Sequence, residues 1–192
     1  MRKIIVHIAT SADGYIARPD GDVAWLDRPS PRGNYGMAAF YRSIDTVLMG
    51  RKTYDLALRF GQTSYPGKKN YIFSRARHRS RTSEVTFVRG DVGRFARELR
   101  RVRGKNIWLV GGAELTGAFL DAGEVDELMI HVIPTLIGDG IPLISPRHRS
   151  IPLALLSSRR YADGVVRLHY SVARQSSSQR SARTAHRRTR PA

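Results

Sequence analysis

The sequence predicts an α/β domain built on a mainly parallel central sheet that ends in a C-terminal antiparallel hairpin. Two observations carry this prediction. Short apolar segments rich in β-branched residues alternate along the chain with segments in which apolar residues recur every three to four positions. The last two strand-like segments instead follow one another directly across Ala162-Asp163-Gly164, a sequence typical of a hairpin turn. Alternating strands and helices favour parallel pairing, whereas the directly connected pair is antiparallel.

The expected strands are short apolar runs bounded by Gly, Asp, Arg or Ser. The first, Lys3–Thr10, is nearly continuous in apolar residues, which is typical of a central strand that is buried on both faces. The other strands are expected at residues 45–49, 70–73, 84–88, 106–110, 126–133, 153–161 and 165–173.

Four helices are expected between these strands, each with an apolar stripe facing the sheet. The clearest spans residues 91–102, where Val92, Phe95 and Leu99 share one face and basic residues lie opposite. The others span residues 35–43, 51–59 and 113–122, and Gly123 is the expected C-cap of the last one.

The composition excludes several classes of protein. Hydrophobic residues make up 41% of the chain and aromatic residues 8%, which is enough for a packed core and excludes a wholly disordered chain. The sequence has no cysteine, which excludes a disulfide scaffold, a cysteine nucleophile and thiolate metal sites. No apolar run approaches the roughly 20 residues that span a membrane, and Ile4–Val6 is too short for a signal-peptide core. We therefore expect a cytoplasmic protein with no membrane partner.

The charge is uneven along the chain, and it divides the protein into two parts. The formal net charge is +17, yet residues 174–192 hold six Arg, no acidic residue and almost no large apolar side chain. We expect a folded domain over residues 1–173 and a disordered Arg/Ser-rich tail over residues 174–192. The surplus favours anionic partners. Two interpretations of the tail stay open: an arm that binds nucleic acid, or a solvated extension without a specific partner.

Glycines mark the ends of two expected strands, and each is followed directly by an expected helix. The first turn is Gly50-Arg51-Lys52-Thr53. Its glycine allows the backbone to approach a ligand closely, the following helix N-terminus offers free N–H groups, and the next three side chains add donors. This combination suits a phosphate. Val110-Gly111-Gly112-Ala113-Glu114 repeats the arrangement. The alternative is an ordinary strand–helix turn. Open α/β sheets bind ligands at the carboxyl ends of their strands, where these turns are expected to lie.

Two further strands end in basic residues, at Ser74-Arg75 and at Arg89-Gly90. Together with Arg51 they place three arginines along one edge of the sheet, which points to a ligand with more than one phosphate. Other motifs are absent: there is no Walker A pattern, no G-x-G-x-x-G after the first strand and no G-x-S-x-G elbow. The six histidines have no metal-like spacing, and His7 and His131, inside apolar strands, are expected to be structural.

Four segments, in order, resemble the dihydrofolate-reductase-like family, and in particular its branch related to the reductase domain of bacterial riboflavin biosynthesis. They are Ile8–Ala17 (IATSADGYIA), Val47–Tyr54 (VLMGRKTY), Gly67–Ser74 (GKKNYIFS) and Trp108–Leu115 (WLVGGAEL). The resemblance continues through Asp126-Glu127-Leu128 and residues 134–140 and covers about residues 2–173. It implies a dihydrofolate-reductase-like three-layer fold, NADPH as the cofactor and hydride transfer to a pteridine- or pyrimidine-like molecule. Homodimers are common among proteins that resemble this branch, so a homodimer is also expected.

The resemblance also implies roles for individual residues. Ala9 and Ile16 would border the nicotinamide, and Ser74, Arg75 and Arg89 would lie near the adenosine 2′-phosphate. The residues that would hold the phosphates or approach the pyrophosphate are Gly50, Arg51, Lys52, Thr53, Val110, Gly111, Gly112, Ala113, Glu114 and Leu115. The peptide bond between Gly111 and Gly112 would be cis. The residues that would contact the substrate are Asp13, Phe40 and Leu56.

The sequence departs from the family pattern at two places. True dihydrofolate reductases carry an acidic residue on the first helix, but Asn34-Tyr35-Gly36-Met37 contains none, so reduction of dihydrofolate itself is not expected. Glu114 stands where those enzymes often have a basic residue. Asp13 is then the remaining candidate for a catalytic carboxylate, and the alternative is that Asp13-Gly14 only forms the turn after the first strand.

Two alternatives to this general reductase stay open. One is 5-amino-6-(5-phosphoribosylamino)uracil reductase of riboflavin biosynthesis, without the deaminase half because the zinc signature of that half is absent. The other belongs to a different class, a non-enzymatic basic protein that binds nucleic acid and keeps the fold only as a scaffold.

Overall fold

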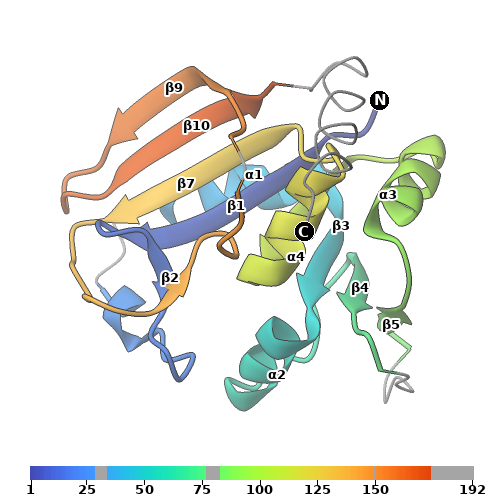
Figure 1. Cartoon of the computed structure of the whole chain (residues 1–192), viewed down its shortest axis with the longest axis horizontal. Helices are drawn as coiled ribbons and strands as arrows, with labels where there is room; N and C mark the ends of the chain where they lie inside the picture. The colour runs from blue at the N-terminus through green and yellow to red at the C-terminus, as the bar shows by residue number, and fades with distance from the viewer. Residues whose placement is uncertain (29–33, 77–82, 149, 174–192) are drawn as a thin grey trace, which may run out of the picture.

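A computed structural model describes residues 1–28, 34–76, 83–148 and 150–173. Figure 1 shows a twisted central sheet with helices on both faces. The large sheet has eight strands in the order β5-β4-β3-β6-β1-β7-β10-β9, and β2 pairs with β8 in a small second sheet. The strands are β1 Ile4–Ser11, β2 Tyr15–Ala17, β3 Ile44–Gly50, β4 Lys69–Phe73, β5 Val85–Val88, β6 Asn106–Gly111, β7 Glu127–Ile133, β8 Ile141–Pro142, β9 Leu153–Arg160 and β10 Val166–Val172.

Six neighbouring strands, from β5 to β7, are parallel, and β10 and β9 add the antiparallel edge. The helices connect the parallel strands: α1 Met37–Ser43, α2 Arg51–Arg59, α3 Val92–Arg101 and α4 Ala113–Asp121. Short 3₁₀ turns, η1 Ala24–Leu26 and η2 Asn34–Gly36, lie between β2 and α1. The predicted fold class, an α/β sheet that is mainly parallel with a C-terminal hairpin, is confirmed.

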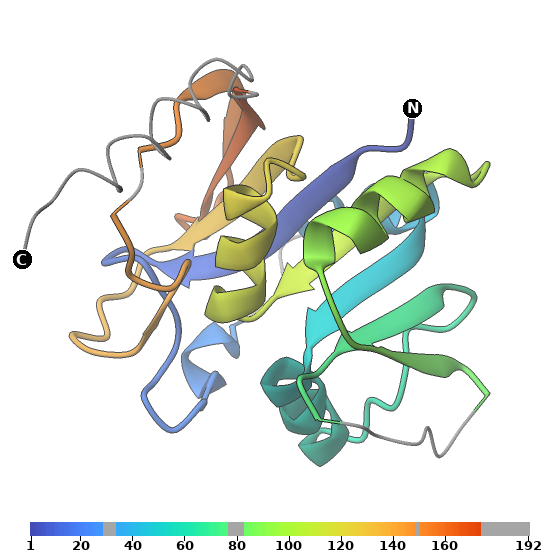
Figure 2. The ribbon, with the colours of Figure 1, turned by 45° about the vertical axis from the view of Figure 1, so that its right-hand side comes forward.

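Two hydrophobic clusters, one on each face of the sheet, make the fold three-layered. On one face α3 and α4 insert Leu99, Leu115 and Phe119 against strand residues that include Ile4 and Leu109. On the other face α1 inserts Phe40 among residues such as Val47 and Trp108. Figure 2 shows α3 and α4 together on one side of the sheet. Since β1 lies between β6 and β7 in the middle of these layers, its nearly continuous apolar sequence is explained.

The β9–β10 hairpin extends beyond the helical layers. All eight residues of β9 are exposed, and all seven residues of β10 are half-buried. The turn forms at the predicted place, between Tyr161 and Val165.

 The hydrogen bond from Gly164 N to Tyr161 O measures 3.1 Å, and Tyr161 N in turn donates to Val165 O at 2.9 Å. Tyr170 and Val172 of β10 pack against the hydrophobic cluster on the α3–α4 face, whereas no residue of β9 belongs to either cluster.

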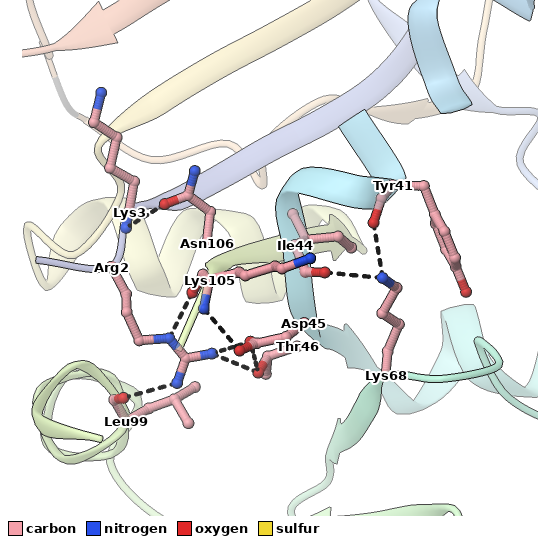
Figure 3. A network of polar contacts seen from close by, with 10 residues as sticks. All are labelled: Arg2, Lys3, Tyr41, Ile44, Asp45, Thr46, Lys68, Leu99, Lys105 and Asn106. Atoms are coloured by element: carbon pink, nitrogen blue, oxygen red, sulfur yellow. Dashed lines mark hydrogen bonds and ion pairs between the residues drawn. The ribbon is translucent and has the colours of Figure 1, made fainter. Parts of the chain in front are cut away.

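The amino-terminal end of the parallel strands is held by a polar network around Arg2 (Figure 3). The Arg2 side chain is only 5% exposed. Its guanidinium pairs with Asp45 and also donates to Lys105 O at 2.6 Å, Thr46 Oγ1 at 2.7 Å and Leu99 O at 3.2 Å. These partners come from three different segments, so Arg2 ties β1, β3 and α3 together.

Most predicted elements are confirmed, with ends that differ by one or two residues. The expected helix over residues 51–59 is observed as α2 with the same ends, and Gly123 N donates to Leu120 O after α4. Sequence periodicity did not predict β2 and β8, because strands of three and two residues are too short to show a period. The tail expected over residues 174–192 lies outside the described residues, and within them no helix has the length and apolarity needed to cross a membrane.

Candidate active site

The two glycine turns that the sequence predicts lie side by side. Gly50 ends β3 and Gly111 ends β6, and these strands are neighbours, with Met49 opposite Gly111. A Cβ atom on Gly50 would lie 3.7 Å from Gly111 O. The carboxyl ends of the two strands thus form a continuous floor of closely spaced backbone.

The second turn requires glycine at both positions. Gly111 has a φ of +124° and Gly112 a φ of +72°, conformations that L-residues with side chains rarely adopt. A Cβ on Gly112 would also lie 3.0 Å from Thr53 Oγ1, so the two turns approach each other closely. No peptide bond among the described residues is cis, so the expectation of a cis bond between Gly111 and Gly112 is wrong. The positive φ angles of the two glycines turn the chain instead.

Each turn leads directly into a helix whose N-terminus has no side-chain cap. Arg51 begins α2 after Gly50, and Ala113 begins α4 after Gly112. No side chain among the described residues caps either helix, and the helix dipoles favour an anion at both starts. The buried Thr116 Oγ1, on the first turn of α4, also has no hydrogen-bond partner among the described residues.

Three arginines follow the strands on one side of this floor. Arg51, Arg75 and Arg89 follow β3, β4 and β5, which are consecutive strands at that side of the sheet. Arg51 Nε pairs with Asp55 at 2.6 Å, and its guanidinium lies 5.7 Å from the centre of the Phe87 ring. Lys52 and Arg89 are exposed.

Glu114 and Ser74 are bound by their neighbours. The Glu114 carboxylate is exposed and lies 3.8 Å from Arg75 Nη2, so it is turned toward a cation at the rim. Ser74 N donates to Val88 O at 3.0 Å, and Ser74 Oγ accepts from Ala76 N at 3.2 Å. Both residues lie next to the glycine floor, at the end where the three arginines gather.

Asp13 joins two loops. Its carboxylate accepts from Gly138 N at 2.7 Å and from Ile137 N at 3.1 Å. A hydrogen bond from the Ser11 side chain, together with these backbone N–H groups, lowers the pKa of Asp13. The carboxylate therefore stays ionised at neutral pH, which favours the turn interpretation over a role as a proton donor.

The other predicted residues lie in β1, in β2 and on the helices. Ala9 pairs with His131 across β1 and β7, and Ile16 lies in β2. Leu56 is half-buried on α2. Phe40 is buried on α1, and its ring centre lies 4.2 Å from that of His7 and 5.5 Å from that of Trp108.

The contact between Phe40 and His7 leads to a site that sequence reasoning missed. His7 on β1 and His131 on β7 are hydrogen-bonded to each other, with 3.2 Å between His7 Nε2 and His131 Nδ1. They are 4% and 7% exposed. We call them the histidine pair. The available signal was that both histidines lie within apolar strands; that the strands are adjacent, and in which register, depends on the fold.

Burial keeps both members of the pair uncharged. Desolvation, with a smaller contribution from neighbouring His131, lowers the pKa of His7 to about 3. Desolvation also lowers the pKa of His131, and the Arg167 charge acts in the same direction, whereas the Tyr35 carbonyl opposes it. At neutral pH each ring therefore offers one N–H and one lone pair.

Tyr35 lies over the pair. Its ring centre is 5.8 Å from that of His131 and 5.0 Å from that of Tyr161. Its hydroxyl donates to the Asp163 carboxylate, and its carbonyl accepts from Tyr161 Oη at 2.9 Å. Burial, then the hydrogen bond with Asp163, raises the pKa of Tyr35 to about 12. Within the described residues, no group of His, Asp and Glu side chains is arranged to hold a metal ion.

The three-layer fold and the glycine floor at the carboxyl ends of β3 and β6 define a dihydrofolate-reductase-like protein. The dihydrofolate reductase from Enterococcus faecalis, complexed with NADP(H), shares the fold, with a TM-score of 0.65 at 12% identity over 88% of this chain and 96% of that one. The chain belongs to the RibD C-terminal domain family, which matches residues 2–167. The family expected from the sequence is thereby confirmed. Since this family is related to reductases, the chain is a reductase-related protein.

Relatives cover almost the whole domain. Two from Bacillus subtilis (strain 168) are named uncharacterized protein YwjB, 36% identical over 170 residues, and uncharacterized protein YyaP, 31% identical over 184 residues. The matches span 88% of this chain and 97% and 94% of those proteins. A structure described as a putative riboflavin biosynthesis protein from Shewanella sp. PV-4 has a TM-score of 0.80 at 29% identity, over 90% of this chain and 99% of that one.

Proposed function

We propose that this protein is an NADPH-dependent reductase that transfers a hydride to a pteridine- or pyrimidine-like small molecule. The observation that carries the proposal is the pair of adjacent glycine turns, each followed by an uncapped helix N-terminus. Such a floor suits a pyrophosphate, because backbone can approach it closely and N–H groups point at it. Membership of the RibD C-terminal domain family supports a reductase.

The residues present fit the cofactor. Gly50, Arg51, Thr53, Gly111 and Gly112 would hold the phosphates, and Arg75 and Arg89, after β4 and β5, would lie near the 2′-phosphate. When bound, NADPH supplies the hydride. The chain binds, orients and excludes water, which are the usual contributions of the protein in such reactions. Ala9, in the middle of the sheet opposite His131, allows a ring to lie against β1 because its side chain is small.

A narrower candidate is 5-amino-6-(5-phosphoribosylamino)uracil reductase. The Thermotoga maritima protein whose name includes this activity together with a deaminase shares the fold, with a TM-score of 0.67 at 15% identity over 90% of this chain and 57% of that one. The excess of positive charge in this chain suits a substrate that carries a phosphate. The non-enzymatic alternative has less support. A tail that binds nucleic acid stays a prediction, and such binding would weaken steeply as salt rises.

The test is titration of the whole protein with NADPH and with NADH, followed by quenching of Trp25 and Trp108. We expect saturable NADPH binding with a dissociation constant on the order of micromolar, and much weaker NADH binding. Arg51→Ala and Arg89→Ala should each weaken NADPH binding, by about tenfold, more than they weaken NADH binding. Arg101→Ala, at the end of α3, is the matched control. Absence of NADPH binding by the folded protein would overturn the proposal.

A further inference from the structure

The histidine pair has hydrogen-bonding capacity that the protein does not use. His7 Nε2 and His131 Nδ1 are joined to each other, and His7 Nδ1 is buried without a partner within the described residues. His131 Nε2 is also buried and makes no hydrogen bond of full geometry there, with only the Tyr35 carbonyl acting on its ring. In a neutral pair only one proton lies between the rings, so of the two outer nitrogens one is a donor and the other an acceptor. Buried polar atoms without a partner are rare and call for an explanation.

A further buried nitrogen without a hydrogen-bond partner in the described part of the chain belongs to Arg167, which is paired with His131 across neighbouring strands. Arg167 on β10 is directly opposite His131 on β7, which is in turn opposite Ala9 on β1. The Nε atom of Arg167 is also buried without a partner among the described residues. Since residues paired across neighbouring strands share one face of the sheet, His131 and Arg167 lie beside Ala9 on that face.

The surroundings of the pair are planar and aromatic. Phe40 and Trp108 lie against His7, with ring centres at 4.2 Å and 6.2 Å. Tyr35 and Tyr161 lie against His131 at 5.8 Å and 6.1 Å. Aromatic side chains of this kind can pack against a further flat ring, because aromatic faces and edges contact another ring in several geometries.

The charges near the pair select against a cationic ring. Arg167 contributes positive charge that lowers the pKa values of both histidines. The Asp163 carboxylate is already engaged by Tyr35 Oη and by Val165 N, and Arg28 donates to Asp163 O at 2.9 Å. A protonated ring would meet no available carboxylate among these groups, whereas an uncharged or anionic ring would meet favourable donors.

The segment over the pair is strained. Tyr35 has φ +51° and ψ 18°, and Asn34 before it has φ +45°. A bulky residue in the left-handed region is unusual, and such residues cluster at ligand-binding and catalytic sites. Here the conformation places the Tyr35 ring over His131 and is held by the hydrogen bond from Tyr161 to the Tyr35 carbonyl.

We propose that the histidine pair recognises, by hydrogen bonds, the polar edge of an uncharged planar ring in the substrate. This ring has a carbonyl next to an N–H. His131 contacts the ring, and His7 is a positioning residue that fixes the tautomer of His131. The pair can offer either a donor or an acceptor at His131 Nε2, depending on which ring holds the shared proton. The inference rests on the proposed function and assigns its substrate-recognition residues.

The test uses two small rings of equal size, uracil and 2,4-diaminopyrimidine, added to the whole protein saturated with NADP⁺. Side-chain ¹⁵N resonances of the histidines report binding. We expect uracil to shift the His7 and His131 signals but not those of His169, which is paired with Glu127. Uracil should bind at least about tenfold more tightly than the diamine, the difference that one well-placed hydrogen bond makes.

Variants separate the roles of the two histidines. His131→Leu should lose about tenfold or more in uracil affinity, with NADP⁺ affinity unchanged. His7→Gln retains a polar atom at the position of Nε2 and should bind uracil nearly as the parent does, whereas His7→Leu should not. His169→Gln is the control.

Equal affinity for the two rings, or uracil binding without shifts at His7 and His131, would overturn the proposal even if His131→Leu failed to fold. Absence of uracil binding by protein that binds NADP⁺ would also overturn it and leave the proposed reductase standing. Absence of NADP⁺ binding would count against the proposed function itself.

Discussion

The two ends of the parallel sheet use polar residues in opposite ways. At the amino-terminal end, buried cations are surrounded by acceptors: Arg2 has four, and Arg100 pairs with Asp126 at 2.7 Å while donating to Arg2 O and Glu124 O. At the carboxyl-terminal end, the helices start without side-chain caps, two glycines have positive φ, and His7 Nδ1 and Arg167 Nε are buried without hydrogen-bond partners within the described residues. Arg100 Nε also makes no such hydrogen bond there, but it lies 3.4 Å from the Glu124 carboxylate. The contrast teaches that paired polar groups hold this fold, whereas the less paired end has the hydrogen-bonding capacity that the proposed ligands would use.

The largest expected effect comes from breaking the network at the amino-terminal end. Arg2→Ala removes the partner of Asp45 and leaves Thr46 and two backbone carbonyls without their donor. Loss of one partner of a buried ion pair costs 3–5 kcal/mol, and the partial exposure of Asp45 places the expected loss in unfolding free energy at about 3 kcal/mol. Urea unfolding measures it. Arg101→Ala, an exposed arginine nearby, should change stability by less than about 0.5 kcal/mol.

At the carboxyl-terminal end the corresponding change should affect binding more than folding. Gly112→Ala forces a side chain into a left-handed conformation and toward Thr53 Oγ1, at an expected cost of about 1–2 kcal/mol in stability. NADPH affinity should fall by at least about tenfold, because the pyrophosphate floor is displaced. The same titration as above measures it. The control Gly61→Ala also changes a glycine with positive φ, but no atom lies within 4 Å of its new Cβ. Equal loss of affinity in both variants would break the comparison.

The uncharged histidine pair gives this end a characteristic pH dependence. An unfolded histidine takes up a proton near pH 6.5, whereas burial lowers the pKa of His7 to about 3. The unfolded state therefore binds more protons between these values, and stability falls as the pH falls. The expected slope is about 1.4 kcal/mol per pH unit for His7 alone. Unfolding free energies between pH 6.5 and 4.5 should show a shallower slope in His7→Leu and the parent slope in His148→Gln. A parent slope near zero would contradict the assignment.

The fold and the two ends differ in how much of them the sequence predicts. The strand–helix alternation and the glycine turns are local patterns, so α2 and the floor around Gly50 and Gly112 were predicted from residues close together in the chain. The histidine pair joins residues 124 positions apart, and its geometry depends on the register between β1 and β7. Sequence periodicity indicates that both residues lie in strands but not that they face each other.

The same limit applies to the network at the amino-terminal end. Arg2 precedes the first strand and would be expected at the surface by its residue type alone. Its burial follows from partners at residues 45, 46, 99 and 105, which only the finished sheet brings together. A Cβ on Gly104 would clash with Asp45 Oδ2 and with the Arg2 guanidinium. This glycine, which no local turn signal singles out, therefore leaves the room that the network needs.

The smallest effect on the folded chain is expected at the hairpin edge, where the unpaired groups are apolar and backbone. Leu155 and Leu156 on β9 are 58% and 52% exposed, and an apolar edge strand of this kind pairs readily with another chain. The predicted homodimer would use this edge, since antiparallel pairing of two copies of β9 brings their leucines together and separates Arg159 and Arg160. Light scattering of the whole protein should give a dimer, and Leu155→Lys should shift it toward monomer while its unfolding free energy changes by less than about 0.5 kcal/mol. Leu136→Lys, at a leucine 75% exposed in a loop, is the control. A monomeric parent protein would contradict the predicted homodimer. It would not affect the comparison between the two ends of the sheet.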